Sequence, residues 1–181
     1  MNSDTLASLA IETLLPKRYF GKYRGTVINN IDPMQIGRIQ AIVPDVSSVV
    51  PTSWAMPCLP VGGIQMGVFA VPIIGAGVWV EFEHGDPDHP IWTGCYWGSA
   101  AEIPATALLS PPPVPAITMQ TPLQNGIIIS DNPAIGITIK TTTGAMIMVT
   151  DLGITISNGK GAMITMVGPV VDVNAGALTI T

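Results

Sequence analysis

The chain has 181 residues, of which 48% are hydrophobic and only 10% charged, and its net charge is −5. A typical soluble domain has about 25% charged residues, so this sequence can bury much of its surface but has few charges to keep a single copy soluble. Seven Lys and Arg residues are too few for a phosphate-binding surface, which excludes nucleic acid as an expected partner. Prolines interrupt the long uncharged stretches, so we expect no membrane-spanning helix.

Residues 1–18 are predicted to form a short helix followed by an arm. Leu6, Leu9 and Leu14 recur at helical spacing, and Pro16 ends the pattern. A helix of this length is not stable alone. We therefore expect it to dock on a partner through Leu6, Leu9, Leu14 and Arg18.

Residues 19–98 hold all of the aromatic residues and are predicted to form a small closed β-barrel of about five strands. The clearest strand is Val78–Phe82, in which Val78, Val80 and Phe82 share one face. A turn is predicted at residues 85–88, where the sequence is Gly-Asp-Pro-Asp. The expected strands are Tyr23–Ile31, Gly37–Val43, Trp54–Cys58, Val68–Ile73, Val78–Phe82 and Ile91–Trp97.

Residues 99–124 are rich in proline, and residues 125–181 carry an internal repeat. The prolines predict an extended, polyproline-like connector without helix. In the repeat, Ile135–Ile139 recurs 17 residues later as Leu152–Ile156, and Gly144–Ile147 recurs at the same offset. Each unit reads as strand, turn, strand, turn, with isoleucines on one face and threonine on the other. About six strands are expected.

A segment of this length buries too little to stand alone, because the apolar row of each repeat needs a neighbour. Three copies around a threefold axis satisfy this need. The prediction from the residues is an all-β chain, in which a small closed β-barrel is followed by a trimeric, interwound triangular β-prism or β-helix. The predicted inward-facing residues of the prism are Ile127, Ile129, Ile137, Ile139, Met146, Ile154, Ile156, Met163, Leu178 and Ile180.

Residues 20–181 resemble the spike proteins of contractile tails: phage baseplate assembly protein V, the T4-type cell-puncturing spike and VgrG. The resemblance rests on the run from Val78 to Gly94, together with Tyr23–Val27, Gly37–Gln40 and the repetitive tail. This resemblance implies that the barrel is an OB-fold. The signature residues of that fold in this sequence are Gly25, Gly37, Trp79, Phe82, Gly85, Asp86, Pro87, Asp88, Trp92 and Gly94.

This resemblance implies a homotrimeric, non-enzymatic spike without cofactor, which pierces the target cell envelope when the sheath contracts. It implies assembly in the producer cell's cytoplasm into a phage-tail-like particle. Only about twenty residues precede the barrel, so a separate hub protein of the baseplate is expected, contacted by the N-terminal residues named above. There is no His-x-His motif for an iron tip. Leu178, Thr179, Ile180 and Thr181 are therefore expected to contact a PAAR-type tip protein.

Four single motifs also allow other functional interpretations, each with less support than a structural one. The cluster of His84, Asp86, Asp88 and His89 could hold a metal, but a polar hairpin turn is favoured. Glu81 and Glu83 would be close on one strand face, yet no base or nucleophile accompanies them. Cys58 and Cys95 could pair, although two buried free thiols are favoured. Methionines of the repeat are expected to fill gaps in the core rather than bind a soft metal.

A second function, a trimeric tail component that binds a receptor or carbohydrate, is also compatible with a trimeric β-prism. Glycan-binding surfaces usually carry exposed aromatic rings, and this sequence has no Phe, Tyr or Trp after Trp97. The spike is therefore the favoured function.

Overall fold

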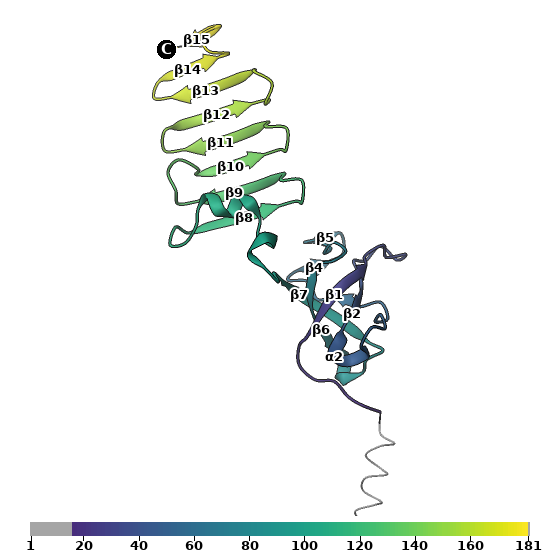
Figure 1. Ribbon diagram of the computed structural model, residues 1–181. Coiled ribbons are helices and arrows are strands. Elements are labelled where there is room, and N and C mark those ends of the chain that lie inside the picture. The colour runs from purple at the N-terminus through teal and green to yellow at the C-terminus, as the bar shows by residue number, and fades with distance from the viewer. Residues whose placement is uncertain (1–15, 181) are drawn as a thin grey trace, which may run out of the picture. The chain divides into compact units, whose positions relative to one another are not determined.

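The computed structural model describes residues 16–180 and divides into two units, residues 1–98 and 99–181. Within the described residues no helix is both long enough and apolar enough to cross a bilayer. The chain is nearly all β, as predicted (Figure 1). The predicted hub-contact residues Leu6, Leu9 and Leu14 lie outside the described residues.

Unit 1 is a small barrel built on a sheet with strand order β2-β1-β6-β7-β3. Backbone hydrogen bonds between Ile39 and Ala55, at 2.7 and 3.2 Å, join the two ends of this order and close the barrel. Its elements are β1 (Tyr23–Asn29), β2 (Gln40–Ile42), α2 (Pro44–Ser47), β3 (Met56–Pro57), β4 (Gly62–Gly63), β5 (Met66–Gly67), β6 (Gly77–Phe82), η1 (Glu83–Gly85) and β7 (Pro90–Tyr96).

The barrel core confirms the alternation predicted for β6. Val78, Val80 and Phe82 are buried, and the residues between them are only half-buried. The other buried members of the core are Val27, Ile39, Ala41, Val43, Ala55 and Trp92. One predicted strand is wrong: Val68–Ile73 contains no strand, and the residues just before it, Met66–Gly67, pair with Gly62–Gly63 in a separate short hairpin.

The structure explains why two positions in the barrel, 25 and 37, are glycines. A Cβ at Gly25 would lie 3.3 Å from the Ile42 carbonyl oxygen and 3.3 Å from the side chains of Val43 and Val80, so β1 packs there with no room to spare. Gly37 has a φ of 84°, and its carbonyl oxygen accepts a hydrogen bond from the Trp92 indole at 3.0 Å. The backbone turn at Gly37 therefore satisfies the one polar atom of a buried tryptophan.

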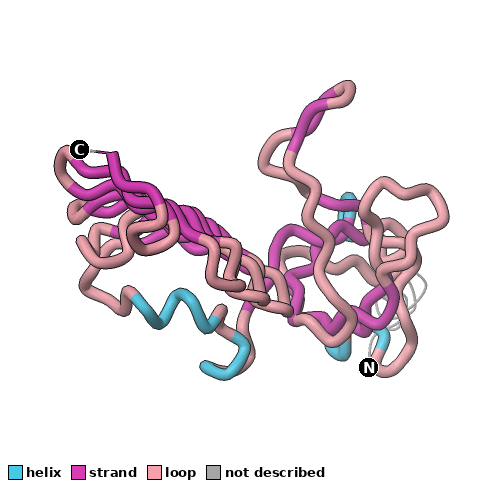
Figure 2. Tube along the Cα trace, turned by 90° about the horizontal axis from the view of Figure 1, so that it is seen from above, coloured by secondary structure: helices cyan, strands magenta, loops and turns pink. Residues whose placement is uncertain are grey.

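Unit 2 is an eight-stranded antiparallel meander in which each strand pairs only with its neighbours in the sequence. The sheet begins earlier and has more strands than the six expected. Figure 2 views the strands from above, stacked along the sheet. The strands are β8 (Ala116–Gln120), β9 (Gly126–Ser130), β10 (Ile137–Lys140), β11 (Met146–Thr150), β12 (Gly153–Ser157), β13 (Met163–Val167), β14 (Val170–Val173) and β15 (Leu178–Ile180).

The proline-rich segment differs from the predicted extended connector. It contains two short 3-10 helices, η2 (Ala100–Glu102) and η3 (Ala105–Leu109), and strand β8. Prolines 104, 111–113 and 115 border η3 rather than interrupt it. Since a proline excludes regular structure only at and near its own position, the stretches between prolines remain free to form short elements.

Candidate functional site

One face of the unit 2 sheet carries two unbroken apolar rows, and we call it the isoleucine face. The register places residues of every strand directly opposite one another in each row. The first row runs Ile117, Ile129, Ile137, Val149, Ile154, Met166, Val171 and Ile180, and the second runs Met119, Ile127, Ile139, Ile147, Ile156, Ile164, Val173 and Leu178.

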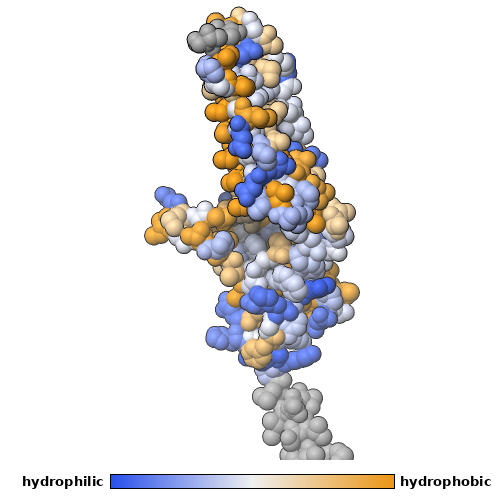
Figure 3. All heavy atoms as spheres, turned by 90° about the vertical axis from the view of Figure 1, so that its left-hand side faces the viewer, coloured by the Kyte–Doolittle hydropathy of each residue, from blue (hydrophilic) through white to orange (hydrophobic). Residues whose placement is uncertain are grey.

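The isoleucine face is open to solvent in a single chain. Its large side chains from β9 to β11, such as Ile127 and Ile137, are between 36% and 49% exposed. Apolar residues form a continuous band along unit 2 in Figure 3. Monomeric soluble proteins rarely expose contiguous apolar patches larger than a few hundred Å². This face therefore has the character of an assembly surface.

The opposite face, which we call the threonine face, has a central row in which six of the eight residues are polar: Thr118, Ile128, Thr138, Met148, Thr155, Thr165, Asp172 and Thr179. Met146 and Met163 also lie on this side, because Met146 is directly opposite Lys140, and both Met146 and Met163 are opposite Ser157. The structure thus places these two residues away from the isoleucine rows with which the sequence analysis grouped them.

Residues 99–115, here called the strap, cover the threonine face at β8 and β9. Thr106 donates through its hydroxyl, at 2.6 Å, and through its backbone N–H, at 3.1 Å, to Oε1 of Gln120. The hydroxyls of Ser110 and Ser130 are 2.6 Å apart. Ile128 and Thr138 are buried on this face. The strap leaves the isoleucine face as the uncovered side of the sheet.

Three of the four residues predicted to contact a tip protein, Leu178, Thr179 and Ile180, form the strand β15. Leu178 is exposed. Thr179 and Ile180 belong to β15, which pairs with β14 on one side and has no strand on its other side among the described residues. Thr181 lies outside the described residues.

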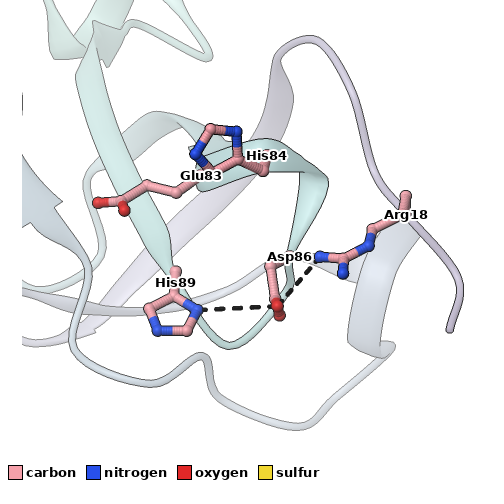
Figure 4. A pocket seen from close by; sticks show the side chains of 5 residues that line it. All are labelled: Arg18, Glu83, His84, Asp86 and His89. Atoms are coloured by element: carbon pink, nitrogen blue, oxygen red, sulfur yellow. Dashed lines mark ion pairs between the residues drawn. The ribbon is translucent and has the colours of Figure 1, made fainter.

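Arg18, predicted to contact a hub, forms an ion pair of 3.0 Å with Asp86 beside an open hollow of about 320 Å³ on unit 1. Figure 4 shows the Arg18 and His89 side chains directed toward Asp86, whereas Glu83 and His84 point elsewhere. The backbone N–H of Asp88 and the Arg18 guanidinium hold the pKa of Asp86 below its usual value. His89 Nδ1 lies 3.9 Å from Asp86 Oδ2, but His84 points elsewhere, and the described residues contain no group of three or more side chains that could hold a metal ion.

Each cation of the described barrel residues has a partner. Lys22 donates to Glu81 at 2.7 Å, and Arg38 pairs with Asp32. Lys17 lies over the Tyr19 ring, and Arg24 lies over the rings of Trp79 and Tyr96. Glu83 starts η1 and so lies beyond the strand that holds Glu81. Glu81 and Glu83 therefore do not form a carboxylate pair on one strand.

The two cysteines are free, as favoured from the sequence, but the expectation that they are buried is wrong. Cys58 and Cys95 are both exposed. Cys58 follows the two-residue strand β3, and Cys95 lies one residue before the end of β7.

Two family models match the chain, one on each unit. Residues 23–97 match the type VI secretion system/phage-baseplate injector OB domain. Residues 116–179 match the phage baseplate V C-terminal trimerisation domain, which begins at the first residue of β8 and ends within β15. No curated protein matches the chain.

Proposed function

The chain belongs to the phage baseplate V family of spike proteins, and we propose that three copies form the central spike that a contractile injection machine drives through its target envelope. The chain is a baseplate component of a phage-tail-like particle. The proposal adds the piercing action, the hub and tip partners, and assembly in the producer cell's cytoplasm before the particle is complete.

The isoleucine face is the observation that carries this proposal. Two apolar rows cross all the strands of the sheet, and nothing in the described chain covers them. Three sheets that turn these rows toward a common axis would bury them at every level. Residues proposed for this core are Ile127, Ile129, Ile137, Ile139, Ile154, Ile156, Leu178 and Ile180.

A piercing role needs a rigid body that transmits force along its length. In unit 2 a short turn joins each strand to the next, and neighbouring strands are hydrogen-bonded along their length. The sheet is therefore one continuous hydrogen-bonded ladder. Burying the isoleucine face of three such ladders would stiffen them further, because close-packed cores resist compression. These properties support a needle more than a loosely tethered binding domain.

The proposed partners lie at the two ends of the chain. A hub protein would bind residues 1–18, whose predicted helix needs a surface to dock on. A PAAR-type tip protein would bind the free edge of β15, since an unpaired strand edge offers backbone groups for hydrogen bonding. Neither proposal requires an enzymatic activity, and both families matched are structural components.

The second candidate, a receptor- or carbohydrate-binding tail component, is less well supported. Unit 2 contains no aromatic residue on which a sugar could stack. A glycan array probed with the purified chain would separate the two functions, because a spike should bind none of the sugars.

The deciding experiment is the mass of the full chain in solution. Static light scattering should give three chains per particle, and the trimer should persist in mild detergent. A stable, soluble monomer would overturn the proposal, since it would mean that one chain tolerates its isoleucine face in water.

A further inference from the structure

The barrel unit has a second apolar surface of its own, on the segment that contains the β4–β5 hairpin. No charged residue occurs between positions 46 and 80. Ile64, at the hairpin tip, is 99% exposed. We call the exposed apolar residues of this segment the hairpin patch: Leu59, Val61, Ile64, Met66, Val68, Phe69, Ile73 and Ile74.

The hairpin patch is held in place rather than loose. The N–H of Val68 donates to the Val61 carbonyl oxygen, which closes the hairpin. Below it, Val71 packs against the barrel core, and Asn30 donates to the Pro72 carbonyl oxygen at 3.0 Å. Figure 2 shows a short two-stranded arm that stands clear of the rest of unit 1. An anchored arm with an apolar tip costs little further ordering when it binds.

We infer that the hairpin patch docks on the barrel unit of a neighbouring copy, which gives the trimer a second interface beyond residues 116–179. This inference rests on the proposed homotrimer. The absence of charge on the patch favours an apolar receiving surface, as at the fully buried centre of protein interfaces. It does not favour nucleic acid or a strongly charged protein.

The short connection between the barrel and unit 2 is the reason to expect that the hairpin patch binds another copy of this chain. Strand β7 ends at Tyr96, and the strap is hydrogen-bonded to β8 from Thr106 onward. Residues 97–105 therefore tether each barrel, and a tether of this length reaches at most about 30 Å. Trimerisation of unit 2 then holds three barrels at an effective concentration on the order of millimolar. Even a weak contact between barrels would be occupied.

A threefold interface joins two different surfaces of each copy, since a cyclic trimer is built from heterologous contacts. The barrel carries a suitable second surface around helix α2. Val49, Val50 and Phe20 are 78%, 60% and 73% exposed. The Tyr19 hydroxyl donates to the Val46 carbonyl oxygen, so the arm that bears Phe20 is fixed beside this helix. We expect the hairpin patch to meet this surface of the neighbour.

Photo-crosslinking of the full chain tests the inference. The photoreactive residue p-benzoylphenylalanine would replace Ile64 and, as a control, Asp88, which is exposed on the polar turn between β6 and β7. Irradiation of the Ile64 variant should give covalent dimers and trimers on a denaturing gel, and the control should give none. Peptide mapping should place the cross-link in residues 19–98 of a second chain, near Val49 and Val50.

The outcomes separate this inference from the proposed function. A monomer by light scattering would overturn both. A trimer without interchain cross-links from position 64, or with cross-links only to residues 116–179, would overturn the barrel interface and leave the spike intact. A cross-link elsewhere in the neighbour's barrel would keep the interface and reject the receiving surface at α2. The variant Ile64→Asp with the photoreactive residue at position 68 should remain trimeric but lose most of its cross-linking.

Discussion

Asp32 and Arg38 form an ion pair that closes the loop between β1 and β2. Arg38 donates to Oδ1 of Asp32 through Nε at 3.0 Å and Nη2 at 2.7 Å. The backbone N–H groups of Met34, Ile36 and Arg38 also donate to this carboxylate. The Asp32 side chain is only 4% exposed. One carboxylate thus organises the whole loop, and the adjacent Arg38 holds its pKa far below the usual value.

Replacing Asp32 by Asn should destabilise the barrel unit. The amide keeps the shape of the carboxylate, but it loses the charge that pairs with Arg38, and its NH₂ group cannot accept hydrogen bonds from the loop. Urea denaturation followed by tryptophan fluorescence should show a lower midpoint, since all four tryptophans lie in this unit. Asp88→Asn is the control and should leave the midpoint unchanged. Equal midpoints for Asp32→Asn and the native chain would contradict the role of this carboxylate.

The same ion pair predicts how the stability of the barrel depends on pH. The pKa of Asp32 is lower in the folded barrel than its ordinary value of 3.8, so the unfolded chain takes up protons first as the pH falls. The stabilisation is complete well above pH 4 and is lost as the pH falls from there toward the folded pKa. Asp86 contributes in the same direction. Urea midpoints at pH 7, 4 and 3 should fall more steeply for the native chain than for Asp32→Asn.

Much of the fold could be predicted because each strand has one buried and one outer face. The alternation of Val78, Val80 and Phe82 is visible in the sequence, and the repeat of Ile137 and Ile154 corresponds to one complete hairpin of the meander. Strand β8 was missed because its alternation, Ile117 and Met119 around Thr118, lies between prolines that suggested an extended connector.

The position of the methionines could not be obtained from the repeat. An offset of 17 residues shows that Met146 and Met163 are equivalent, but equivalence does not tell which face they share. Adjacent strand residues point to opposite faces, so Met146 and Ile147 cannot both face the isoleucine rows. The register with Lys140 and Ile139 decides between them. No sequence pattern predicts the contacts of the strap, such as the hydrogen bond from Thr106 to Gln120.

Replacing Ile137 by Asp should prevent assembly of the trimer. Three unpaired carboxylates would meet at one level of the proposed core, and each costs several kcal/mol when buried without a partner. Thr155→Asp is the matched control because it lies in the row that already holds Asp172. Light scattering should give a loss of trimer for the first variant and three chains for the second. A heat-stable trimer of Ile137→Asp would mean that the isoleucine face points outward.

A paired substitution on β11 tests the assignment of its two faces. Met146→Glu should leave the trimer intact, because the new carboxylate would lie opposite Lys140 on the threonine side, and opposite charges across strands are favourable. Ile147→Glu, one residue further along the same strand, should abolish the trimer. The mass of each variant in solution is the measurement. The reverse result, with Met146→Glu dissociated and Ile147→Glu trimeric, would restore Met146 to the core.

The strap should be released by removing two hydroxyls. In the double variant Thr106→Val with Ser110→Ala, Gln120 keeps only the hydrogen bond from the Thr106 backbone N–H, and Ser130 loses its partner in the strap. Each lost hydrogen bond is worth about 1 kcal/mol, which corresponds to roughly thirtyfold more frequent opening for the pair.

Elastase, which cuts after small residues such as Ala105 and Ala107, should therefore cleave the strap of the double variant faster than that of the native trimer. Thr165→Val is the control, since it makes the same Thr to Val change on the same face away from the strap. The trimer mass before cleavage should not change, because the strap lies on the side of the sheet opposite the isoleucine rows. If the double variant is cleaved at the native rate, then apolar packing over Ile128, rather than these hydroxyls, holds the strap in place.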